Sequence, residues 1–161
     1  MDSAITTEPP TKWPTVPRET ALPLIQSLLQ DLIRDSRHRF KTIARDLGLT
    51  FYQASVLLTI RRLQRPASMS DLSDGLQLPA STITSVIDAL IKRDLVIRER
   101  HSSDRREVFA TLTPAGRTLA DRLARRGFEV FAARFDAMDD ADLAALLAAL
   151  RHLVPDPSQP T

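Results

Sequence analysis

The feature that most constrains the fold of this chain is a pair of short helical segments followed at once by two strand-like runs. Segment 80–93 carries apolar side chains at helical spacing, with small hydroxyl residues on its opposite face. The runs 95–100 and 107–112 alternate or are β-branched, and a polar, charged link separates them. A short helix, a tight turn, a second helix and a hairpin predict a winged helix-turn-helix.

Helix start and stop signals divide the chain before this motif. Apolar residues recur at helical spacing over 19–46 and predict one long amphipathic helix, with Pro23 in its first turn and Gly48 after its end. Capping-box patterns at 50–53 and 68–71 each predict the start of a further helix.

Two helices are expected after the hairpin. Thr113 and Pro114 predict the start of a long helix that runs to about Met138. The aspartates of 139–142 then cap a last helix with a leucine stripe, ending near Leu153. The expected fold class is therefore mainly α with a small β-hairpin wing, that is, a winged helix-turn-helix with long N- and C-terminal helices.

Composition excludes several classes of chemistry. The chain contains no cysteine, which excludes disulfides, thiolate nucleophiles and cysteine-ligated zinc. Its histidines, His38, His101 and His152, have no metal-ligand spacing, and no Gly-rich phosphate loop occurs. No apolar run approaches the roughly 18 residues of a membrane span. A cytoplasmic protein that is not an enzyme and carries no cofactor or metal is expected.

Charge is distributed unevenly along the chain. Residues 89–126 hold ten arginines and lysines against five acids, whereas 127–161 hold two against six. Nearly all of the bases are arginine, the residue best suited to phosphate forks. A basic block beside an acidic one predicts a surface that meets a polyanion, with double-stranded DNA as the partner.

Taken in order, these stretches resemble the MarR family of winged helix-turn-helix transcriptional regulators over about 25–153. The residues that carry the resemblance are Leu49-Thr50-x-x-Gln53, Asp71-Leu72, Pro79-Ala80-Ser81-Thr82-Ile83-Thr84, Asp104-Arg105-Arg106 and Leu112-Thr113-x-Ala115-Gly116. Three positions depart from the family pattern: Gln77 and Asp94 stand where glycine is frequent, and Ser73 stands where alanine is usual.

The resemblance implies a symmetric homodimer in which the first helix and the last two helices of each subunit interdigitate. The broad apolar stripes of these helices fit that arrangement, because no monomeric core would cover them. The expected organisation is a disordered arm at 1–18, helical dimerisation segments at 19–47 and 114–153, a DNA-binding lobe at 50–112, and a disordered tail at 154–161.

The expected DNA contacts come from two places. Short hydroxyl side chains on the second helix of the motif suit close approach to phosphates and base edges; they are Ser81, Thr82, Thr84 and Ser85. At the wing, the resemblance implies that Arg106 enters the minor groove and that Asp104 orients it. For Arg105, contact with a phosphate and simple solvation stay open.

The resemblance further implies a small aromatic or anionic effector. Arg37, His38, Phe51 and Tyr52 are candidates for its site by position, with core packing as the alternative for the aromatic residues. The expected function is a ligand-responsive repressor that acts as a homodimer on an inverted-repeat operator. A constitutive architectural DNA-binding protein and a winged-helix module that binds protein are the alternatives.

Overall fold

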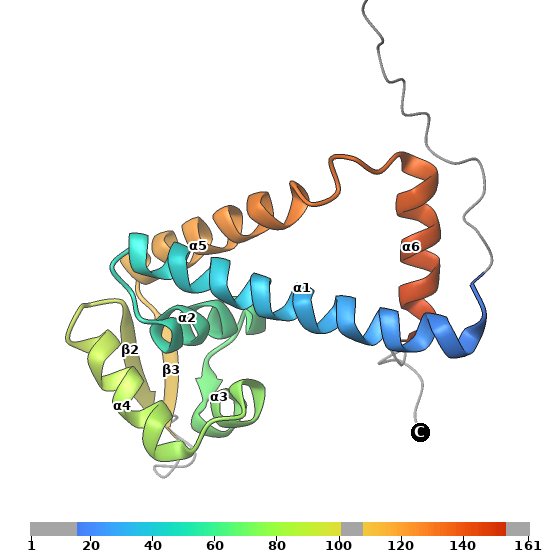
Figure 1. The fold of residues 1–161 in the computed structure, drawn as a ribbon. Coiled ribbons are helices and arrows are strands. Elements are labelled where there is room, and N and C mark those ends of the chain that lie inside the picture. The colour runs from blue at the N-terminus through green and yellow to red at the C-terminus, as the bar shows by residue number, and fades with distance from the viewer. Residues whose placement is uncertain (1–15, 101–107, 154–161) are drawn as a thin grey trace, which may run out of the picture. The chain divides into compact units, whose positions relative to one another are not determined.

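The computed structural model describes residues 16–100 and 108–153, which form six helices and a three-stranded sheet (Figure 1). The chain divides into two units, one through Ser36 and one from Arg37 onward. The elements are α1 (Arg18–Asp46), α2 (Phe51–Leu63), β1 (Ala67–Ser68), α3 (Met69–Leu76), α4 (Ala80–Ile91), β2 (Val96–Arg100), β3 (Val108–Leu112), α5 (Pro114–Ala132) and α6 (Asp140–Leu153). The expected disordered segments lie, apart from 16–18, outside the described residues.

The long first helix is confirmed, but it begins one residue earlier than expected. The amides of Thr20 and Ala21 both donate to the carbonyl of Pro17 at 2.9 Å, so Arg18 belongs to the helix and not to the preceding arm. Pro23 consequently lies in the second turn, where its missing amide removes one intrahelical hydrogen bond. Within the first unit, nearly every side chain of α1 is exposed.

The core lies in the second unit, where α2, α4, the sheet and the start of α5 enclose a cluster of buried aliphatic side chains. The predicted inward stripe of α4 is confirmed, because Ile83, Ile87 and Leu90 are fully buried. The helix ends at Ile91, two residues before the expected Arg93, since the chain turns through a left-handed residue three positions later.

The predicted hairpin is confirmed and gains a third strand. Its two strands pair antiparallel from Val96 opposite Leu112 to Arg100 opposite Val108. On the other side of β3, Ala67 pairs with Ala110, so the strand order is β1-β3-β2. The two-residue β1 was missed because it is too short to show an alternating pattern.

The long helix after the hairpin is shorter than predicted. It ends at Ala132 and not near Met138, because the amides of Arg134, Phe135 and Met138 bond to carbonyls three residues back, which is a tighter turn than the α-helix. The predicted cap of α6 is confirmed, since the Asp139 carboxylate accepts from the amide of Asp142 at 2.8 Å.

Among the described residues, no helix combines the length and the apolar character that crossing a membrane requires. The same residues hold no group of three or more histidine, aspartate or glutamate side chains arranged to bind a metal ion.

Candidate nucleic-acid interface

The four predicted hydroxyl residues, Ser81, Thr82, Thr84 and Ser85, lie together on α4 and are called the hydroxyl face below. Three are exposed and Thr82 is half-buried. The hydroxyl of Thr84 donates to the carbonyl of Ala80 at 2.9 Å, and that of Ser85 donates to Ser81 at 3.0 Å. Both hydroxyls donate within the helix, and their oxygen atoms can still accept hydrogen bonds. Because the side chains are short and polar, another molecule can approach the hydroxyl face closely.

The N-terminal end of α4 adds free backbone donors to this face. Pro79 occupies the N-cap and supplies no side-chain cap. Thr82 and Ile83 are the first amides that bond back, both to the Pro79 carbonyl, so the exposed amides of Ala80 and Ser81 have no backbone acceptor in the described chain. Such a helix terminus favours a negatively charged group.

The turn that positions α4 contains two of the departures from the family pattern. Gln77 adopts the left-handed conformation, with φ 54°, where glycine would be unstrained. Ser73 is one turn before it, and its hydroxyl donates to the carbonyl of Leu78 at 2.6 Å. An alanine could not make that bond. The serine therefore stabilises a turn whose left-handed conformation is less favourable for glutamine than for glycine.

An ion pair joins α4 to the wing. The Arg98 guanidinium of β2 lies 2.9 Å from the Asp88 carboxylate of α4, and both side chains are partly exposed. The wing strand is thereby tied to the helix beside it (Figure 1). No local sequence pattern indicates this pair, because ten residues and a turn separate Asp88 from Arg98.

The predicted wing residues Asp104, Arg105 and Arg106 lie outside the described residues. The two strands that flank this link, β2 and β3, are described up to Arg100 and from Val108, and these two residues are paired.

The C-terminal end of α4 is held by two contacts that were not predicted. Arg93 donates to the carbonyl of Gly48 at 2.8 Å, which fixes the α4 end to the loop between α1 and α2. The buried Thr113 hydroxyl donates to the carbonyl of Asp94 at 2.7 Å and accepts from the amide of Gly116 at 2.9 Å. Asp94 itself is left-handed, with φ 55°, at the position where the family often has glycine.

Another ion pair braces the helix that precedes the turn. Arg65 binds both oxygens of the Asp71 carboxylate at 2.8 and 2.9 Å, and the same carboxylate accepts from the Ser68 amide at 2.8 Å to complete the capping box of α3. The hydrogen bond from Arg65, followed by the one from the Ser68 backbone, holds the pKa of Asp71 well below its usual range.

The effector candidates are brought together only in part. The Arg37 guanidinium lies over the Phe51 ring, 5.1 Å from its centroid, and Tyr52 meets the same ring edge-on at 5.5 Å. Phe40 also meets the Phe51 ring edge-on, with 5.5 Å between the two ring centroids. His38 is exposed on α1.

Comparison with known proteins agrees with this geometry. The model of the MarR family matches residues 49–108. The HTH-type transcriptional regulator YpoP of Bacillus subtilis is 29% identical over 123 residues, which cover 76% of this chain and 86% of YpoP.

Solved structures agree as well. A MarR family protein from Bacillus stearothermophilus aligns with a TM-score of 0.75 at 20% identity, over 86% of this chain and 96% of that one. BpsR of Bordetella bronchiseptica, whose DNA binding is regulated by 6-hydroxynicotinic acid, aligns with a TM-score of 0.63 at 26% identity, over 82% and 94%. The order of elements, the family model and these relatives lead to one conclusion: residues 49–108 match the MarR family, and the chain resembles the winged-helix transcriptional regulators of that family.

Proposed function

We propose that this protein is a ligand-responsive repressor that binds an inverted-repeat operator as a homodimer. In this proposal the hydroxyl face of α4 enters the major groove, and Arg106, oriented by Asp104, enters the adjacent minor groove. The observation that carries the proposal is the exposed hydroxyl face, with the free amides of Ala80 and Ser81 at its end. Because the proposed partner is double-stranded DNA, the proposal includes the cytoplasmic location expected from the sequence.

The homodimer is supported by apolar surface that the described chain leaves uncovered. Large aliphatic and aromatic side chains are exposed along α1, near the end of α5 and along α6. These side chains are far more numerous than the scattered single apolar residues on the surface of an ordinary monomer. A second copy of the chain, related by a two-fold axis, would cover the same faces of both subunits and set two α4 helices about 34 Å apart.

The ligand response is supported by a relative and by position. BpsR, at 26% identity, changes its DNA binding with 6-hydroxynicotinic acid. In this chain, the proposed effector residues are Arg37, His38, Phe51 and Tyr52. The cation and the rings of this group offer a charged and an aromatic partner to one small anion.

The test is binding to an operator selected from random duplexes, with a matched pair of variants. Thr84 and Thr118 are both exposed threonines whose hydroxyls bond to the carbonyl four residues back, at 2.9 and 3.0 Å. Thr84→Glu places a carboxylate against the DNA and should weaken binding about tenfold or more, a loss of about 1.4 kcal/mol. Thr118→Glu adds the same charge on α5 and should leave the affinity nearly unchanged.

Salt and the wing provide further readings from the same assay. Two α4 helices and two wings should neutralise roughly 6–10 phosphates, so affinity should fall by about 10³-fold or more between 50 and 200 mM salt. Arg106→Ala should cost about 1–3 kcal/mol per half-site. Equal effects of Thr84→Glu and Thr118→Glu would contradict the proposed contact. Equal affinity for random duplex would favour the architectural alternative, and no DNA binding would favour the protein-binding module.

A further inference from the structure

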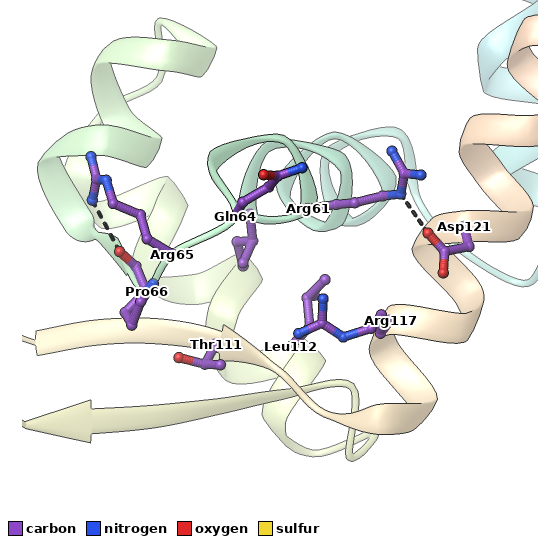
Figure 2. Close-up of a pocket in the computed structure, with 9 residues that line it drawn as sticks. Arg61, Gln64, Arg65, Pro66, Thr111, Leu112, Arg117 and Asp121 are labelled. Carbon is purple, nitrogen blue, oxygen red and sulfur yellow. Dashed lines mark hydrogen bonds and ion pairs between the residues drawn. The ribbon is translucent and has the colours of Figure 1, made fainter.

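A pocket of about 430 Å³ opens at the end of the sheet opposite the wing tip (Figure 2). Its walls are the last turn of α2, the link into β1, the end of β3 and the first turns of α5. The side chains that line it are Ile60, Arg61, Gln64, Arg65, Pro66, Thr111, Leu112, Arg117 and Asp121. This volume is in the range of small-molecule sites, and neither the hydroxyl face nor the proposed effector residues contribute to it.

Three arginines surround the pocket, but two of them are already neutralised. Arg61 on α2 lies 2.6 Å from the Asp121 carboxylate of α5, and Figure 2 shows its guanidinium directed to that group. Arg65 points the other way, to the carbonyl of Pro66 and to the carboxylate of Asp71.

Arg117 is the remaining cation. No carboxylate of the described chain pairs with its guanidinium, which reaches from α5 toward Leu112 in Figure 2. Asp121 follows one turn later on the same helix, but Arg61 holds its carboxylate. The pocket therefore carries one uncompensated positive charge, presented as a planar fork of donors that matches a carboxylate or a phosphate.

The floor beneath this cation is apolar. Ile60 and Leu112 are buried, at 4% and 6% exposure, and Pro66 is a further apolar residue of the lining. Gln64, at the left-handed C-cap of α2, adds an exposed amide that can donate a hydrogen bond. An occupant that satisfies both features has an anionic head and a compact apolar body.

We propose that this pocket binds a small organic oxyanion, a carboxylate or a phosphate monoester, with its charged group on Arg117 and its apolar body over Ile60 and Leu112. The site lies on a single unit of the fold and away from the hydroxyl face. Its occupancy is therefore measured on the protein alone and does not depend on the proposed DNA binding.

The test uses benzoate and phenyl phosphate as probes, with benzamide as the uncharged counterpart of benzoate. Titration should shift the side-chain Nε–H signal of Arg117 in NMR spectra, and calorimetry should give saturable binding of both anions and at least about tenfold weaker binding of benzamide. Whichever anion binds tighter identifies the head group.

Matched variants locate the site. Arg117→Gln should weaken anion binding about tenfold or more, whereas Arg125→Gln, which removes the same charge from an exposed position of α5 outside the pocket, should not. Asp121→Asn removes the one carboxylate of the lining and frees Arg61, so it should tighten binding. Equal affinities of the two arginine variants, weaker binding by Asp121→Asn, equal binding of benzamide, or no saturable binding at millimolar anion would each overturn the proposal. Thermal unfolding of every variant confirms that the fold is intact.

Discussion

The helices α4 and α6 are similar in length and each carries apolar side chains at helical spacing, yet they differ completely in burial. In α4, with 12 residues, Ile83, Ile87 and Leu90 are all 0% exposed. In α6, with 14 residues, no side chain is buried, and Leu147 and Leu150 are 51% and 42% exposed. An apolar stripe shows which side of a helix avoids water, but not what covers that side.

The difference also shows where helix stability comes from. A helix of this length is marginal on its own, and packing of its apolar face supplies most of its stability. In α4 that packing is within the described chain, against α2, α3 and the sheet. Within the residues that the structure describes, no side chain of α6 is buried, and the proposed second copy would provide the missing packing.

The largest effect is expected for substitutions in α6 that disrupt the proposed dimer. Leu147→Glu with Leu150→Glu places two carboxylates in the proposed interface, at a cost of several kcal/mol each if both are buried there. Wild type should sediment at about twice 18.0 kDa, and the double variant should sediment as a monomer. Ala148→Glu, on the opposite face of the same helix, is the control and should remain dimeric. A wild-type monomer that binds its operator tightly would contradict the proposed assembly.

The next effect compares two glycines of α5, one packed against the lobe and one beyond it. A Cβ at Gly116 would collide with the backbone carbonyl of Leu95, so Gly116→Ala should lower the free energy of unfolding by about 3 kcal/mol. A Cβ at Gly127 meets no atom within 4 Å. Gly127→Ala should therefore raise the same quantity by about 0.5–1 kcal/mol, through helix propensity.

Urea unfolding followed by far-UV circular dichroism, at one fixed protein concentration, measures both glycine variants. Opposite signs are the expected result. Destabilisation by both would mean that Gly127 also lies in a close contact, as a crossing with the second copy would produce.

The smallest effect concerns pH and the lobe alone. Because Arg65 and the Ser68 amide hold the pKa of Asp71 below its usual range, Asp71 stabilises the folded state above a pH near 4, the ordinary carboxyl pKa. That contribution is lost as the pH falls through the lower pKa of the folded protein. Asp71→Asn should therefore flatten the acid side of the stability profile, measured as the urea midpoint at a series of pH values. Asp74→Asn, at an exposed aspartate of the same helix, is the control for the loss of one negative charge.

Local sequence alone determined the starts of most helices. The capping boxes at Thr50 and Ser68 and the caps at Thr113 and Asp139 form as predicted, because each joins side chains and amides three residues apart. The hairpin and the inward stripe of α4 were predictable for the same reason, since alternation and helical periodicity are local. So was the placement of the hydroxyl face on the outside of α4.

The tertiary structure decided what these elements touch. Two interactions join residues on different elements, and no local pattern indicates them. They are the hydrogen bond of Arg93 to Gly48 and the ion pair of Asp88 with Arg98. The close approach that requires glycine at Gly116 comes from the chain at Leu95, far from it in sequence. Likewise, Arg117 has no carboxylate partner among the described residues, because Arg61 holds the Asp121 carboxylate and Arg65 holds that of Asp71. Side-chain partners depend on packing, and packing is settled by the whole chain at once.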